Sequence, residues 1–231
     1  MVTDLNQRLA EIRSRIEEAA RRSGRKPEEI ELLAVTKTRG LAELLEAWEA
    51  GLRLFGENRV QEALGKITAW PTERRAEWRL IGNLQRNKAR KALDLFSRID
   101  SLDRLELALD LQRIISETDR KIEVLVEVNT SGEPSKHGVS PDRLEELLEG
   151  VLQRCPRLSV RGLMTVGPLF EDPRDVAASF CRLRELRDRV SKAFGLEMPV
   201  LSMGMSDDFE TAIEQGSTCV RLGRALFGPR E

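Results

Sequence analysis

The sequence predicts an α/β protein, a single (β/α)8 TIM barrel with an extra N-terminal helix. The chain has 231 residues and 40% apolar content, enough for one well-buried core of the size that such barrels commonly have. Short apolar runs alternate with helical patterns, and roughly eight such units follow the first helix, the number that a closed parallel barrel requires. A doubly wound open sheet is the alternative.

The first element is an amphipathic helix that Gly24 ends. Its apolar residues recur at helical spacing, and they are Leu5, Leu9, Ile12, Ile16 and Ala19. The strands are predicted from the apolar runs that follow this helix, with the weakest signal at 97–101. The runs span about 31–36, 52–55, 78–82, 97–101, 122–129, 158–165, 199–203 and 218–222.

Two of the intervening helices are clear from the sequence. One opens at Ser140-Pro141, since proline suits the first turn of a helix. Their inward residues are Leu144, Leu147, Leu148 and Val151 in the first, and Val176, Phe180, Leu183, Leu186 and Val190 in the second. No linker rich in Pro, Gly or Ser divides the chain, so we expect one domain over 1–231.

Charge and cysteine content exclude several classes of partner. Lys and Arg number 38 and Asp and Glu 39, so the net charge of -1 predicts no nucleic-acid or membrane partner. The basic stretch 86–91 lacks interleaved aromatic residues and is interpreted as a solvated helix face. Three widely spaced cysteines favour reduced thiols in the cytoplasm over a zinc site. Neither a signal peptide nor an apolar run of about 18 residues is found.

The polar residues that follow the predicted strands are the candidates for a functional site, because parallel barrels carry their chemistry where strands end. Lys37 follows the apolar run 32–36. Burial at such a position favours the neutral, nucleophilic form of an amine, which forms imines. The alternative is an ordinary lysine at a strand end whose ammonium reaches solvent.

The loops after the seventh and eighth strands predict an anion site. Ser206 is expected to be the N-cap of the next helix, whose first turn offers free N–H groups. Gly223 and Arg224 follow the last strand and open a short helical turn, at a place where many barrels bind phosphate. The alternative is that Ser206 only caps its helix and Gly223 only turns the chain. Asp207 and Asp208 would repel an anion, so we expect them to point outward.

Arg221 lies within the last strand, where side chains alternate, so an inward Arg221 leaves Val220 and Leu222 to face the helices. An inward arginine needs an anion or an acceptor, and a pyridine nitrogen is one such acceptor. The alternative is a buried ion pair with a barrel carboxylate such as Glu57. A strand-end amine beside a phosphate site is what a Schiff base with pyridoxal phosphate needs.

Other polar residues at strand ends have weaker signals. Glu57, Asn58 and Asn83 are candidates to donate or accept hydrogen bonds at a cofactor ring oxygen, and helix capping by Asn58 and Asn83 is the alternative. His137 is the only histidine of the chain and is expected in a loop. A histidine-based metal cluster or catalytic dyad is therefore not predicted.

Several segments match one known family across nearly the whole chain. They are 34–37 (AVTK), 55–58 (FGEN), 81–88 (IGNLQRNK), 162–164 (GLM), 201–206 (LSMGMS) and 216–223 (GSTCVRLG). In these segments the chain resembles the pyridoxal phosphate homeostasis protein family. The resemblance implies a barrel like the N-terminal domain of alanine racemase. The cofactor-binding residues that it implies are Lys37 for the covalent bond, Ser206, Gly223 and Arg224 for the phosphate, Arg221 for the pyridine nitrogen, and Asn58 and Met203 around the cofactor.

Two positions depart from the pattern of that family. Arg79 stands where the family often has histidine, and Arg224 stands where it usually has threonine. The threonine hydroxyl would give the phosphate one hydrogen bond. Its loss leaves the backbone N–H in place, and the guanidinium can add a charge-assisted contact.

The sequence favours a carrier of pyridoxal phosphate over an enzyme. A racemase needs a second base opposite its lysine, and alanine racemases use a tyrosine from another domain, whereas this chain has no tyrosine. We therefore expect a cytoplasmic monomer that holds the cofactor and delivers it to enzymes that lack theirs, with little amino-acid turnover and no metal. The alternatives are an amino-acid racemase that uses Lys37 with Cys219 or a water, and a barrel that binds a phosphorylated metabolite without an imine.

Overall fold

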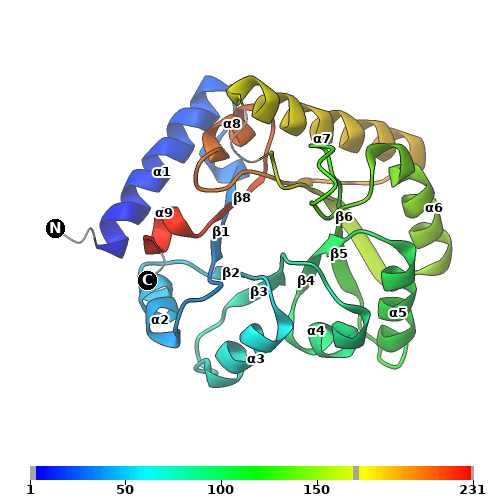
Figure 1. The fold of residues 1–231 in the computed structure, drawn as a ribbon. Coiled ribbons are helices and arrows are strands. Elements are labelled where there is room, and N and C mark those ends of the chain that lie inside the picture. Colours follow the sequence, from blue (N-terminus) through cyan, green and yellow to red (C-terminus); the bar gives the residue numbers. More distant parts are fainter. Residues whose placement is uncertain (1–3, 169–171, 230–231) are drawn as a thin grey trace.

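Eight parallel strands close into a barrel in the computed structural model, which describes residues 4–168 and 172–229 (Figure 1). The strands neighbour one another in sequence order, and β8 pairs with β1 to close the ring. They are β1 (Glu31–Val35), β2 (Leu54–Glu57), β3 (Glu77–Leu80), β4 (Arg98–Leu102), β5 (Ile122–Glu127), β6 (Leu158–Met164), β7 (Val200–Ser202) and β8 (Cys219–Leu222). The predicted TIM barrel is confirmed, including its weakest strand at 97–101, and the open sheet is wrong.

Helices form an outer layer around this ring (Figure 1). Those among the described residues are α1 (Leu5–Arg22), α2 (Leu41–Glu49), α3 (Val60–Ala69), α4 (Ala89–Leu95), α5 (Leu105–Ile115), α6 (Leu144–Arg154), α7 (Pro173–Phe194), α8 (Phe209–Glu214) and α9 (Arg224–Phe227), with short 3-10 turns η1 (Pro27–Glu29), η2 (Arg86–Lys88) and η3 (Pro141–Arg143). The extra helix α1 packs against α8 and α9. Within the described part of the chain, no helix is long and apolar enough to cross a membrane.

One predicted strand starts too early. The run 52–55 was expected to be extended, but Leu52 donates its N–H to the carbonyl of Ala47 at 3.0 Å, in the turn that ends α2. Leu52 is apolar because it packs in the core under that turn, where it is 5% exposed. The strand itself begins two residues later, at Leu54, and continues to Glu57.

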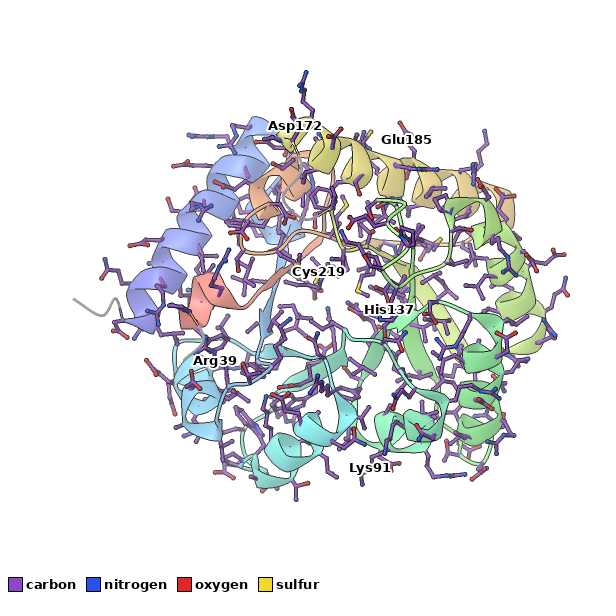
Figure 2. All side chains as sticks on the ribbon, in the orientation of Figure 1. Arg39, Lys91, His137, Asp172, Glu185 and Cys219 are labelled. Atoms are coloured by element: carbon purple, nitrogen blue, oxygen red, sulfur yellow. The ribbon has the colours of Figure 1, made fainter. Side chains whose placement is uncertain are left out.

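The apolar core has two layers of very different size. The larger layer lies between the strands and the helices and includes Val220 and Leu222 of β8. The smaller layer consists of Leu33, Val35 and Cys219, which alternate with those outward residues along β1 and β8. Figure 2 shows Cys219 inside the ring of strands. The alternation therefore runs as predicted, with Arg221 inward.

Charged side chains fill the barrel at the N-terminal ends of its strands. Arg79 is 5% exposed and pairs with Glu31 at 2.7 Å and with Glu77 at 2.6 Å. Arg98 is 3% exposed and pairs with Asp100 at 2.6 Å. Such pairs satisfy charges that would otherwise be costly to bury. Arg79, which departs from the family pattern, thus has a structural role at the end of the barrel away from Lys37.

The basic stretch 86–91 is confirmed as a solvated helix face. Arg86 and Arg90 are exposed and pair with Asp110 of the neighbouring helix α5 and with Glu117, which follows that helix. Lys91 points outward from the helical rim (Figure 2).

Candidate functional site

A cavity of about 640 Å³ opens at the C-terminal ends of the strands, on the side where β1 and β8 meet. Six of the seven predicted site residues line it: Lys37, Asn58, Ser206, Arg221, Gly223 and Arg224. The remaining lining residues are Val35, Arg39, Ile81, Val166, Met205, Asp207, Gly228 and Pro229. Met203 is the exception, because it is fully buried in the larger core layer. Met205, two residues later, is the methionine at the cavity.

Lys37 lies in a tight turn that follows β1. The carbonyl of Thr36 accepts the N–H of Arg39 at 3.0 Å, which makes Lys37 the second residue of the turn and Thr38 the third. Thr38 has a φ of 65°, a left-handed conformation that a β-branched residue rarely adopts. The turn thus brings the Lys37 amine to the cavity through a backbone geometry that needs support.

Three charged residues support this turn from behind. Lys66 of α3 donates to the carbonyl of Thr36 at 2.6 Å and to the carboxylates of Glu57 and Glu62 at 2.7 Å each. Glu62 also accepts the N–H of Thr38. Burial raises the pKa of Glu57, against the opposing hydrogen bonds from Lys66 and Thr36. We call Glu57, Glu62 and Lys66 the rear cluster.

Glu57 lies elsewhere than expected, and Glu62 and Lys66 were not among the predicted site residues. Glu57 was a candidate to contact a cofactor or to pair with Arg221, but it points away from the cavity and pairs with Lys66. A signal for Lys66 was present, because Val60, Ala63 and Lys66 are the buried residues of α3 and share a spacing of three. A lysine on the buried stripe of a helix indicates a partner inside the fold.

Arg221 crosses the inside of the barrel and has neutral partners. Its guanidinium donates to the hydroxyl of Ser202 at 2.8 Å and to the carbonyl of Thr165 at 2.7 Å. It is 4% exposed, and burial lowers its pKa. The proposed ion pair with Glu57 is therefore wrong, since Glu57 lies outside the ring of strands.

The segment after β7 differs in detail from the predicted anion site. Helix α8 begins at Phe209 with Asp208 as its N-cap, so Ser206 is not the N-cap. Ser206 instead accepts the N–H of Ala225 at 3.1 Å, which joins this loop to the start of α9. Gly204, with a φ of 96°, redirects the chain after β7, and residues 205–208 pass before the helix starts at Phe209.

The two aspartates after Ser206 behave differently from each other. Asp207 is exposed at the rim of the cavity and forms an ion pair with Arg224. Asp208 is half-buried, accepts the N–H of Met205 at 2.5 Å and has its pKa raised by burial, so the outward expectation is wrong for it. The Arg224 guanidinium is thereby paired at the rim, while Gly223 and Arg224 at the start of α9 line the cavity.

Asn58 and Asn83 do not cap helices, so the alternative interpretation of both residues is wrong. The N-cap of α3 is Arg59, and Asn58 instead lines the cavity with a buried amide oxygen, Oδ1, that has no hydrogen-bond partner among the described residues. Asn83 donates to Asp103 at 3.2 Å and lies 3.5 Å from the ring of His137. His137 is an exposed loop residue, as predicted.

Glu127, at the end of β5, is a buried carboxylate that the sequence analysis did not single out. Burial, with repulsion from Asp103, raises its pKa to about 7, and attraction to Arg221 acts in the opposite direction. The sequence feature that indicates Glu127 is its position as the single charged residue directly after the apolar run 124–126. Burial also raises the pKa of Cys219 to about 11. Within the described ranges no group of acidic, Cys or His side chains could hold a metal ion.

Comparison with known proteins identifies relatives along almost the full chain. The family model for the alanine racemase N-terminal domain matches residues 7–231. A pyridoxal phosphate homeostasis protein of Aquifex aeolicus is 43% identical over 225 residues, which cover 97% of this chain and 98% of the relative. The protein of the same name from Escherichia coli (strain K12) is 39% identical over 239 residues, with 100% and 98% covered.

Solved structures agree with this result. PipY of Synechococcus elongatus PCC7942 with PLP bound is 35% identical and superposes with a TM-score of 0.83, covering 97% of this chain and all of PipY. Alanine racemase of Clostridium difficile 630 shares only 14% identity at a TM-score of 0.75, and 57% of that longer chain is covered. That distant likeness shows the barrel fold alone. The chain therefore belongs to the pyridoxal phosphate homeostasis protein family, within the larger family of alanine racemase N-terminal domains.

Proposed function

We propose that this protein binds pyridoxal 5'-phosphate and takes part in intracellular pyridoxal phosphate homeostasis, holding the cofactor as a Schiff base on Lys37 for storage and delivery. One observation carries the proposal: Lys37 lines the same cavity as Ser206, Gly223 and Arg224, so an amine and an anion site share one space. The names of the relatives and the PLP-bound structure of PipY support the same cofactor.

The phosphate is proposed to lie between Ser206 and the start of α9. Ser206 uses its oxygen to accept the N–H of Ala225, which leaves its hydroxyl proton for an anion. The N–H groups of Gly223 and Arg224 belong to a helix start, where intrahelical partners are missing. The Arg224 side chain receives no phosphate role, because Asp207 pairs with it at the rim.

The ring is proposed to lie between Arg221 and Asn58. Arg221 has further N–H groups beyond the two bonds to Ser202 and Thr165, and it can donate one to a pyridine nitrogen. The unpartnered Oδ1 of Asn58 fits a ligand that brings a hydroxyl or another donor to the cavity. Met203 would act indirectly, by packing the segment that carries Met205.

The same residues favour holding the cofactor over amino-acid turnover. Bound pyridoxal phosphate supplies an aldehyde and an electron-withdrawing ring, and a guanidinium at the ring nitrogen leaves that ring a poorer electron sink than a carboxylate would. The racemase alternative needs a second base, and the Cys219 thiol is protonated at neutral pH because its pKa is about 11. The chain also has no tyrosine.

The proposal extends to domain organisation, oligomeric state, compartment and the recipients of the cofactor. We propose that residues 1–231 act as one domain and as a monomer in the cytoplasm, and that enzymes lacking their pyridoxal phosphate receive it from this protein. The even charge balance and the three cysteines without a disulfide among the described residues support a small-molecule role in a reducing compartment.

The test is a borohydride experiment on the protein incubated with pyridoxal phosphate. Reduction should fix one cofactor on the peptide that contains Lys37, as found by an absorption spectrum and peptide mass analysis. Lys37→Ala should lose this covalent label and keep part of its noncovalent binding through the phosphate site. The exposed Lys91 provides the control, and Lys91→Ala should label like the wild type.

The competing functions give different results. A borohydride-stable label that survives in Lys37→Ala would overturn the assignment of the amine. Rapid inversion of an amino acid in a chiral assay, lost in Lys37→Ala, would establish the racemase instead of the carrier. Phosphate-dependent binding without any imine absorbance would point to a phosphorylated metabolite.

A further inference from the structure

The turn that carries Lys37 is held by side chains that do not line the cavity. Lys66 lies 2.6 Å from the carbonyl oxygen of Thr36, the residue before Lys37. Glu62 accepts the N–H of Thr38, the residue after it. The hydroxyl of Thr36 donates to Glu57 at 2.5 Å. The rear cluster therefore grips the peptide groups on both sides of the lysine.

The rear cluster is buried, so its charged groups need these contacts. Lys66 is 9% exposed and Glu57 is fully buried, so each charge needs the other to replace the hydration that it loses on burial. A buried ion pair of this kind contributes little net stability compared with an apolar pair of the same volume. It does fix geometry, because Lys66 must meet three oxygens at once, those of Thr36, Glu57 and Glu62.

The turn needs this fixing because its backbone is strained. A positive φ at the third turn residue suits glycine or asparagine, whereas Thr38 carries a branched side chain. Such a conformation is unfavourable for a residue other than glycine and persists where surrounding contacts determine it. The contacts that determine it here are the bond from Thr38 to Glu62 and the double use of the Thr36 carbonyl by Arg39 and Lys66.

We infer that Lys66 is a positioning residue for Lys37: through Thr36 and the rear cluster it sets the turn so that the Lys37 amine meets an aldehyde bound in the cavity. The inference rests on the proposed function. In the step concerned, the Lys37 nitrogen bonds to the aldehyde carbon, and the aldehyde oxygen leaves as water with the two amine protons. Lys66 takes no part in the bond exchange and acts on its geometry.

Lys66→Met tests the inference, because it keeps an unbranched side chain of most of the length and removes the three contacts of the ammonium. Imine formation is followed by stopped-flow absorbance after mixing with pyridoxal phosphate. Noncovalent binding is measured separately with 4'-deoxypyridoxine 5'-phosphate, which has no aldehyde. We expect imine formation to slow by about 10- to 100-fold, the effect of a small misplacement of a reacting group. Affinity for the aldehyde-free probe should stay within about twofold, because the phosphate site is intact.

Arg79→Met is the matched control. It also replaces a buried, doubly paired cation with methionine, but at the opposite end of the barrel. It should lose a comparable amount of stability and form the imine at the wild-type rate. Equal imine rates in Lys66→Met and Arg79→Met would overturn the positioning role and leave Lys66 a structural residue.

A second variant covers the case in which Lys66→Met does not fold. Glu62 is 26% exposed, so Glu62→Ala removes the acceptor of the Thr38 N–H at less risk to the core. It should slow imine formation in the same direction, and a wild-type rate in a folded Glu62→Ala would also overturn the inference. A wild-type protein without any borohydride-stable label would refute the proposed function itself, which is a separate outcome.

Discussion

Glu127 and Arg221 show how one buried charge depends on another at the scale of single residues. The hydrogen bonds of Arg221 go to the neutral groups of Ser202 and Thr165. Glu127 is 6% exposed, and its attraction to Arg221 is the contribution that opposes its raised pKa. Each charge therefore makes the other less costly to bury.

The raised pKa of Glu127 gives stability a specific pH dependence. Below about pH 4.5 the carboxyl is protonated in both folded and unfolded chains, so it has no effect. As pH rises to about 7, the unfolded chain ionises first and the folded state loses relative stability. At 1.36 kcal/mol per pKa unit the full loss is about 3 kcal/mol.

Glu127→Gln should remove this loss. Urea unfolding at pH 4 and pH 8 should show the variant gaining about 3 kcal/mol relative to the wild type between the two values. Glu123→Gln is a suitable control, since Glu123 lies on the same strand but is exposed. An unchanged difference between wild type and Glu127→Gln at the two pH values would contradict the raised pKa.

At this scale the sequence predicted the positions of site residues better than their partners. Lys37, Arg221 and Gly223 reach the cavity because strand periodicity and chain order place strand ends at one mouth of the barrel. The hydrogen-bond and ion-pair partners predicted for Ser206 and Glu57 were wrong, because these contacts depend on which neighbouring element packs beside each residue. Ala225 and Lys66 are such neighbours, and no local pattern reports a contact between distant elements.

At the scale of elements, the turn 36–39 combines local strain with distant support. Thr38 needs both a positive φ and a free N–H, the first for the turn and the second for Glu62. Glycine satisfies both without strain, and proline satisfies neither, because its ring fixes φ near -65° and replaces the N–H. Substitution of Thr38 by glycine and by proline therefore distinguishes the need for a positive φ and an N–H group from the effect of losing the threonine side chain.

Thr38→Pro should destabilise the fold by about 3 kcal/mol or more and abolish efficient imine formation. Thr38→Gly should remain within about 1 kcal/mol of the wild type, because relief of strain offsets the greater flexibility of the unfolded chain. Thermal unfolding and the borohydride label measure the two effects. A Thr38→Pro variant with normal stability and labelling would show that the turn geometry is unimportant.

Element positions were largely predictable and element ends were not. Strand β4 was found from its weak apolar run, because each strand of a closed barrel must repeat the same pattern. The start of α8 was missed by two residues, since Gly204 lets the chain take a path that sequence rules for caps do not describe. Leu52 was misassigned because burial, which its side chain reports, does not distinguish a strand from a turn.

At the scale of the whole molecule, α1 covers the seam where the ring closes. It lies along α8 and α9 (Figure 1), and Arg15 and Arg22 pair with Glu210 and Glu214 of α8. Arg8 also donates to the carbonyl of Leu226 in α9 at 2.6 Å. The apolar face of α1 packs into the larger core layer, as its helical spacing predicted.

Leu9→Ala should therefore weaken the whole fold although it lies in the first helix. Leu9 is 2% exposed, and truncation of a buried leucine typically costs about 2–5 kcal/mol. Ser14→Ala, on the exposed face of the same helix, should change stability by less than about 0.5 kcal/mol. Chemical denaturation followed by circular dichroism distinguishes the two, and a separate early transition in Leu9→Ala would show that α1 unfolds on its own.

The closing seam also has a consequence for the loaded protein. Arg39, after β1, donates to the carbonyl of Gly228, which is 189 residues away in the sequence, and the cavity lies between these two segments. A ligand that is bonded to Lys37 and also held at Gly223 would link the end of the first strand to the end of the last strand. Release of pyridoxal phosphate would remove this link. The empty and loaded proteins should therefore differ most in the hydrogen-exchange rates of the amides where β1 and β8 meet.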